Sequence, residues 1–209
     1  MTKAYDNVIE RSVFLHPVHY GIMYGSNNVI AIKSGSGGSI EGYNGKYLEI
    51  ASVLREKYGC TIICASNPKT VFGVYTASAK QYITLIKNVC MLKRIGNPKI
   101  YAVGVSRGGA MFLTQHYKYP EIKNVLSINA PDNFSPLSVI SSCSRSDADV
   151  QFVYGSKDPS AKHRRLLPKN ANVRIIEGQN HQFSVEGRET VKDVILEWVS
   201  SIPEIIQKK

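Results

Sequence analysis

The sequence has few acidic residues and no long apolar segment. Asp and Glu number 16 against 26 Lys and Arg, which gives a formal net charge of +10. No apolar run approaches the roughly 18 residues that a membrane helix requires, and the first residues lack the apolar core of a signal peptide. We therefore expect a cytoplasmic protein that does not span a membrane.

The excess of positive charge favours anionic partners or substrates electrostatically, but it does not predict a fold. The densest basic cluster consists of Lys157, Lys162, His163, Arg164 and Arg165. One interpretation is a solvated surface, which is what most charge runs are. The other is a site for a phosphate or carboxylate. Because no nucleic-acid module and no interleaved basic and aromatic residues accompany the charge, we expect no nucleic-acid partner.

The four cysteines do not form the pattern of a metal site. Cys60 and Cys64 flank three residues of a predicted strand, where a rise of about 3.3 Å per residue holds them too far apart for a disulfide. Together with Cys90 and Cys143 they show neither C-x-x-C spacing nor a nearby pair of histidines. We therefore predict reduced, packed thiols, with no metal and no other cofactor.

Short β-branched runs alternate with helical patterns along most of the 209 residues. This alternation is typical of a mostly parallel sheet with helices on both faces, and the length fits a single α/β domain spanning residues 1–209. The predicted strands are 8–15, 19–24, 28–33, 61–65, 99–105, 125–129, 150–154 and 173–176. The predicted helices are 47–58, 78–93 with Ser78 as its cap, 108–117 and 185–202, and the Ser- and Asp-rich segment 130–149 is predicted to be an irregular loop.

The segment between a predicted strand and a predicted helix contains the pattern G-x-S-x-G at residues 104–108. Gly104 and Gly108 permit a tight turn that projects Ser106 above the sheet. The N–H of Arg107 and the positive end of the helix would then face an oxyanion formed during acyl transfer. We therefore predict that Ser106 is a nucleophile. The alternative is that the glycines only serve close packing and that Ser106 caps the helix.

A serine hydroxyl becomes a nucleophile when a base lies within hydrogen-bond reach and a carboxylate orients that base. His181 follows the last predicted strand, so it would share the carboxyl edge of the sheet with Ser106. Asp158 follows strand 150–154, and Pro159 would stabilise the turn after it. We therefore predict His181 as the base and Asp158 as the acid.

Alternatives remain open for the base and for the acid. Asp132 follows strand 125–129 and competes with Asp158, whose carboxylate would also suit a helix cap. The other candidate bases have less favourable positions, near the opening strands, in the helix after Ser106 or in the basic cluster: His16, His19, His116 and His163.

The motifs at residues 104–109, 155–159 and 180–181, in the chain order Ser, Asp, His, resemble those of the α/β-hydrolase family. The resemblance implies an eight-stranded, mostly parallel sheet with an antiparallel second strand. It also implies an oxyanion hole completed by the loop after the third strand, residues 34–39, with the N–H of Ser36 as the second donor beside Arg107. In this loop the chain has Ser34-Gly35 where the family commonly has His-Gly.

The segment between the sixth and seventh predicted strands holds only about 20 residues, too few for a substantial lid. We therefore expect an open site and a small-molecule or acyl substrate. The leading hypothesis is a serine hydrolase that cleaves a carboxylic ester or thioester. One alternative is a thioesterase for acyl-carrier or coenzyme A substrates that uses the basic cluster. The other is a non-catalytic binding protein with the same fold.

Overall fold

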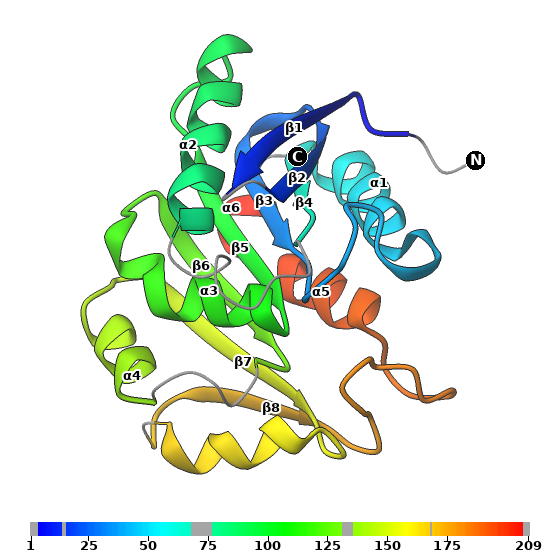
Figure 1. Cartoon of the computed structure of the whole chain (residues 1–209), viewed down its shortest axis with the longest axis vertical. Coiled ribbons are helices and arrows are strands. Elements are labelled where there is room, and N and C mark those ends of the chain that lie inside the picture. Colours follow the sequence, from blue (N-terminus) through cyan, green and yellow to red (C-terminus); the bar gives the residue numbers. More distant parts are fainter. Residues whose placement is uncertain (1–3, 14–15, 68–76, 131–135, 168, 207–209) are drawn as a thin grey trace.

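The computed structural model describes residues 4–13, 16–67, 77–130, 136–167 and 169–206. Within these residues the strands form one eight-stranded sheet in the order β1-β2-β4-β3-β5-β6-β7-β8 (Figure 1). Strand β2 is antiparallel to β1 and β4, whereas β4, β3, β5, β6, β7 and β8 pair in parallel. The predicted sheet with its antiparallel second strand is thereby confirmed. The strands are β1 (Asn7–Val13), β2 (His16–Met23), β3 (Ser26–Lys33), β4 (Cys60–Ala65), β5 (Lys99–Val105), β6 (Ile122–Ile128), β7 (Asp149–Gly155) and β8 (Asn172–Ile176).

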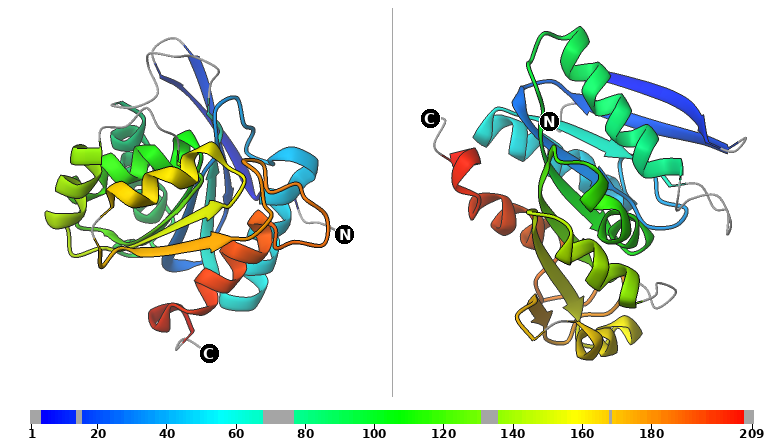
Figure 2. Two further views of the ribbon diagram at one scale, coloured as in Figure 1. Left: turned by 90° about the horizontal axis from the view of Figure 1, so that it is seen from below. Right: turned by 90° about the vertical axis from the view of Figure 1, so that its left-hand side faces the viewer.

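Helices cover both faces of the sheet (Figure 2). The apolar side chains of α2, α3 and α4 pack on one face, and those of α1, α5 and α6 pack on the other. The central parallel strands β3, β4 and β5 are therefore buried on both sides, as their continuous β-branched runs predicted. The helices are α1 (Lys46–Tyr58), α2 (Ala77–Leu92), α3 (Arg107–Gln115), α4 (Pro136–Ser144), α5 (Val191–Ser200) and α6 (Pro203–Ile206), and the 3₁₀ helices are η1 (Tyr43–Gly45), η2 (His116–Lys118) and η3 (Pro159–Leu166).

Strands β2 and β6 each begin three residues earlier than predicted, at His16 and Ile122, and three predicted elements differ in other ways. Segment 130–149 contains α4, which buries Val139 against the first face although its serines resemble a loop sequence. The last long helix begins at Val191, not at 185, because the side chain of Thr190 accepts a hydrogen bond from the N–H of Asp193 and caps it there. Helix α2 begins at Ala77, so Ser78 lies inside the helix and is not its cap.

None of the helices in the described part of the chain has the length and apolar character needed to span a bilayer. None of the four cysteines, which all lie in the described ranges, forms a disulfide, and three of them, Cys60, Cys64 and Cys90, are buried.

Candidate active site

Ser106 lies at the junction of β5 and α3, in a backbone conformation with φ 51° and ψ −120°. Glycines on both sides make this sharp turn possible. A Cβ at Gly104 would lie 2.4 Å from the Cα of Gly109, and one at Gly108 would lie 2.3 Å from the carbonyl oxygen of Lys33. Because real Cβ atoms do not approach other atoms so closely, strand and helix reach this separation only with glycine at these positions.

His181 lies in the loop after β8, and its Nε2 is 3.0 Å from Ser106 Oγ. The residue that orients this loop is Asn129, at the end of β6. Its side-chain amide donates to the carbonyl oxygens of Asn180, at 3.2 Å, and His181, at 2.9 Å. Its side-chain oxygen accepts from the N–H of Gly155, at 2.9 Å. The contacts therefore tie the ends of β6 and β7 to the histidine loop.

Asp158 follows β7, and its side chain makes two separate sets of contacts. Oδ2 lies 2.7 Å from His181 Nδ1. Oδ1 accepts hydrogen bonds from the N–H of Ser160, at 2.8 Å, and from its hydroxyl, at 2.7 Å, which caps η3. The cap predicted as an alternative role and the contact with the histidine therefore occur together, one on each oxygen.

The surroundings of the Asp158–His181 pair favour its charged form. Burial alone would raise the pKa of Asp158, but the hydrogen bonds from His181 and Ser160 outweigh it and hold the pKa below its usual value. The hydrogen bond to Asp158 raises the pKa of His181, against the opposing effect of burial. In the neutral imidazole, Nδ1–H donates a hydrogen bond to the ionised carboxylate of Asp158, so Nε2 carries no proton and can accept a hydrogen bond from the serine hydroxyl. The arrangement is therefore suited to moving a proton from Ser106 to His181.

The loop Ser34–Gly38 lies directly against Ser106. A Cβ at Gly35 would be 3.2 Å from Ser106 Cβ and 3.9 Å from its Oγ. Ser36 is the next residue, and its N–H has no acceptor among the described residues. Arg107, the other predicted donor, is the first residue of α3. Both predicted backbone donors therefore belong to segments that adjoin Ser106.

The remaining candidates have other environments. His116 is buried and its Nδ1 lies 3.0 Å from the carbonyl oxygen of Phe112. His19 faces Glu10 across the opening hairpin at 3.6 Å. His16 begins β2, and His163 belongs to η3. Asp132 lies outside the described residues.

Asn129 was not identified from the sequence as a residue that holds the His181 loop. A signal for Asn129 exists, because a polar residue directly after a buried strand needs hydrogen-bond partners. The Asn side chain also tolerates the φ of 49° found at this position.

The basic cluster begins beside Asp158. Lys157 precedes this residue, and the other four members lie in η3, the short helix that the Asp158 carboxylate caps. Lys157, Arg164 and Arg165 are exposed. Within the described ranges, no group of three or more His, Cys, Asp or Glu side chains is arranged to hold a metal ion.

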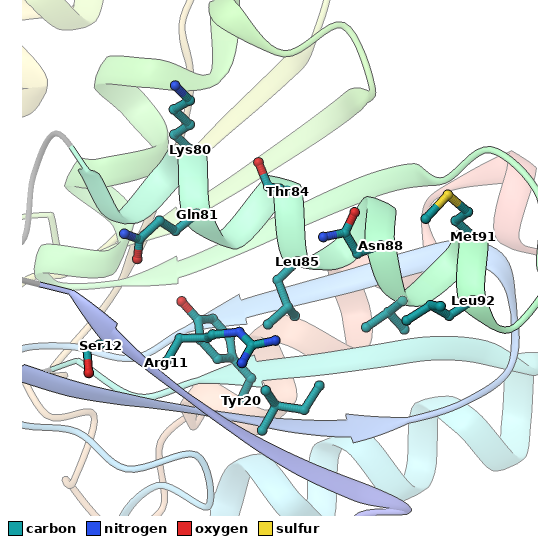
Figure 3. Close-up of a pocket in the computed structure, with 12 residues that line it drawn as sticks. Arg11, Ser12, Tyr20, Lys80, Gln81, Thr84, Leu85, Asn88, Met91 and Leu92 are labelled. Carbon is teal, nitrogen blue, oxygen red and sulfur yellow. The ribbon is translucent and has the colours of Figure 1, made fainter.

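A cavity of about 780 Å³ lies between the β1–β2 hairpin and α2 (Figure 3). Apolar side chains such as Leu85 and Leu92 line it together with Arg11 and Gln81. Ser106, Asp158 and His181 are not among its lining residues, so this cavity is separate from the site around the serine.

No protein-family model and no curated protein sequence matches the chain. Solved structures match it closely in fold. Est1E from Butyrivibrio proteoclasticus has a TM-score of 0.64 at 14% identity, with 96% of this chain and 99% of that chain covered. Dienelactone hydrolase from Anabaena variabilis has a TM-score of 0.64 at 18% identity, with 93% and 96% covered. A serine hydrolase without a lid from Xanthomonas campestris has a TM-score of 0.57 at 13% identity, with 93% and 91% covered. The chain therefore has the α/β-hydrolase fold, as its motifs predicted.

Proposed function

We propose that the protein is a serine hydrolase that cleaves a carboxylic ester or thioester through an acyl-enzyme on Ser106. The observation that carries the proposal is the continuous series of contacts from Ser106 Oγ to His181 Nε2, at 3.0 Å, and from His181 Nδ1 to Asp158 Oδ2, at 2.7 Å. These distances lie within hydrogen-bond reach for a nucleophile, its base and the carboxylate that orients the base. The matching structures are named as esterases and hydrolases, which agrees with the proposal.

In this mechanism Ser106 Oγ attacks the carbonyl carbon while its proton passes to His181 Nε2. The bond to the leaving group then breaks, and His181 returns the proton to the leaving oxygen or sulfur. A water molecule gives a proton to His181 and attacks the acyl-enzyme, and Ser106 regains its proton as the carboxylic acid departs. The N–H groups of Arg107 and Ser36 are the proposed donors to the oxyanion at both steps.

The test measures labelling of Ser106 by a fluorophosphonate and hydrolysis of p-nitrophenyl acetate. We expect labelling and an initial burst of p-nitrophenol in the wild type, and the loss of both in Ser106→Ala, with activity lowered on the order of 10⁶-fold. Ser52→Ala is the matched control, because Ser52 Oγ donates to a helix carbonyl, that of Leu48, away from the site. If the wild type takes up no label and hydrolyses no ester, the non-catalytic binding protein becomes the better hypothesis.

The position of the basic cluster beside Asp158 favours one more specific candidate, a thioesterase for coenzyme A or acyl-carrier substrates. The exposed guanidinium groups of Arg164 and Arg165 would bind the phosphate or acidic groups of the carrier. The test compares KM for acetyl-coenzyme A in Arg164→Glu/Arg165→Glu with KM in Lys57→Glu/Lys99→Glu. The control pair has the same change of charge at the opposite, amino edge of the sheet. An equal KM in both double variants would exclude a role of the cluster in carrier binding.

A further inference from the structure

The molecule buries a lysine immediately before the loop that faces Ser106. Lys33 is the last residue of β3 and its relative exposure is 1%. Its Nζ donates to the carbonyl oxygen of Ser66 at 2.6 Å, and in the described part of the chain no carboxylate lies within ion-pair distance of it. Burial lowers the pKa of Lys33 to about 7. An ammonium group without a counter-ion is costly to bury, so this position is unfavourable for stability alone.

The acceptor of this hydrogen bond belongs to the end of the neighbouring strand. Ser66 follows β4, and its backbone N–H and Oγ both bond to His19 on β2, at 2.9 Å and 2.8 Å. Lys33 therefore links the carboxyl end of β3 to that of β4, at a point where β4 is already attached to β2.

The next residue, Asn67, connects the end of β4 to the loop Ser34–Gly38 by hydrogen bonds. Its side-chain amide donates to the carbonyl oxygen of Ser34 at 3.1 Å. Its backbone N–H donates to Gly38 O at 2.9 Å, and its carbonyl oxygen accepts from the N–H of Gly37 at 2.9 Å. Both ends of the loop Ser34–Gly38 are thus bonded to a single residue, which is buried at 2% exposure.

Ser34 adds a second connection at the position where the α/β-hydrolase family commonly has histidine. Its hydroxyl lies 3.0 Å from the carbonyl oxygen of Ala65 and 3.1 Å from that of Gly38. The loop that these contacts hold is the one whose Gly35 packs on Ser106. Its position decides whether the N–H of Ser36 faces the reacting oxygen, because oxyanion stabilisation depends on donors held at 2.7–3.1 Å.

We propose that Lys33 is a positioning residue, whose hydrogen bond to Ser66 fixes Asn67 and thereby holds the loop Ser34–Gly38 in place for oxyanion stabilisation. This inference rests on the proposed hydrolase function. Lys33 does not contact the reacting atoms; it acts through Ser66 and Asn67.

The experiment compares Lys33→Met with Tyr82→Phe. Tyr82 is also fully buried on this side of the sheet, and its hydroxyl donates to the strand carbonyls of Ile32 and Ile63, not to the loop. We expect Lys33→Met to lower both the rate of fluorophosphonate labelling and kcat for p-nitrophenyl acetate about 10- to 100-fold. KM should stay within about twofold and the Tm should be unchanged or higher, because removal of a buried charge often stabilises a protein. Tyr82→Phe should show the opposite pattern, a lower Tm with kcat nearly unchanged.

A double-mutant cycle that combines Lys33→Met with Asn67→Ala tests whether Lys33 acts through Asn67. If Lys33 acts through Asn67, the double variant loses no more activity than the more damaged single variant. Losses that multiply, or a Lys33→Met protein that labels as fast as the wild type, would overturn the inference. If Lys33→Met does not fold, the comparison passes to Ser34→Ala and Asn67→Ala, which must lower the labelling rate without a matching loss of Tm. Failure of the proposed function is distinguishable, because the wild type itself would then remain unlabelled.

Discussion

The turn that carries Ser106 and the loop Ser34–Gly38 lie against each other, but they are held by different forces. The turn depends on steric fit, since Gly104 and Gly109 allow β5 and α3 to approach as closely as they do, and Gly108 allows α3 to lie against the end of β3. The loop depends on polar contacts from the end of β4, made by Ser34, Asn67 and Lys33. A steric fit is lost with a single added methyl group, whereas a polar network can lose its geometry while the fold survives. We therefore expect changes in the turn to act mainly on stability and changes in the loop to act mainly on activity.

The largest loss of activity is expected from a change that disturbs proton transfer from Ser106 to His181. Asp158→Asn should lower kcat on the order of 10⁴-fold, because an amide no longer holds His181 in the required tautomer. The acid limb of the pH–rate profile, where protonated His181 stops accepting a proton, should also move to lower pH, since Asp158 is what raises the pKa of His181. Stopped-flow ester hydrolysis from pH 5 to 9 measures both, with Asp149→Asn, at the opposite end of β7, as control.

Gly104→Ala tests whether the turn that carries Ser106 depends on steric fit. The new Cβ would lie 2.4 Å from Gly109, so we expect the free energy of unfolding to fall by about 3 kcal/mol or more. Gly59→Ala is the control, because Gly59 has a φ of 63° but no atom within 4 Å of an added Cβ, and left-handed strain alone costs about 1–2 kcal/mol. Urea denaturation measures both variants. Gly104 does not have a positive φ, so a loss at Gly104 no larger than that at Gly59 would mean that the close contact with Gly109 does not require glycine in the turn.

Because the ammonium group of Lys33 is buried next to the loop, the free energy of unfolding of the protein should depend on pH. The steric contacts of the turn contribute no such dependence. Since burial lowers the pKa of Lys33 to about 7, the unfolded chain binds this proton more strongly than the folded protein does. The free energy of unfolding should therefore rise between about pH 7 and pH 10, by up to a few kcal/mol relative to Lys33→Met, which lacks this titration. Below pH 7 the cost is complete and constant. Denaturation of both proteins across this range measures the difference, and parallel curves would show that burial does not lower the pKa of Lys33.

Strand and motif predictions succeeded where local chemistry was sufficient. The bounds of β5 and the end of α1 at Gly59 follow from β-branched runs and from a left-handed glycine cap. The predicted start of α5 at residue 185 was wrong, because the segment 186–190 contains a glycine and no large apolar residue, and Thr190 and Asp193 form the cap that begins the helix. Helix α4 was missed because its serines have weak helix propensity, and burial of Val139 outweighs that propensity.

In the candidate site, too, some residues could be predicted from local sequence and others could not. Ser106, Asp158 and His181 could be chosen from the sequence because each follows the carboxyl end of a predicted parallel strand, and such ends meet at one edge. Asn129 and Asn67 also follow buried strands, where a polar residue needs hydrogen-bond partners, but the sequence does not separate an asparagine that binds a neighbouring loop from one that forms a turn. Only their partners, the His181 loop and the Ser34–Gly38 loop, distinguish them.

The sequence by itself determined the parallel sheet, the glycines around Ser106 and the order Ser, Asp, His, because periodicity, backbone freedom and position after a strand are local properties. The tertiary structure decided the distances that join these three residues and the environment of Lys33. From the sequence alone, a lysine at the end of an apolar strand gives no indication of whether its ammonium group is buried or exposed to solvent. The hydrogen-bond acceptor of Lys33 is Ser66 at the end of β4, which comes to lie beside β3 only when the sheet is assembled.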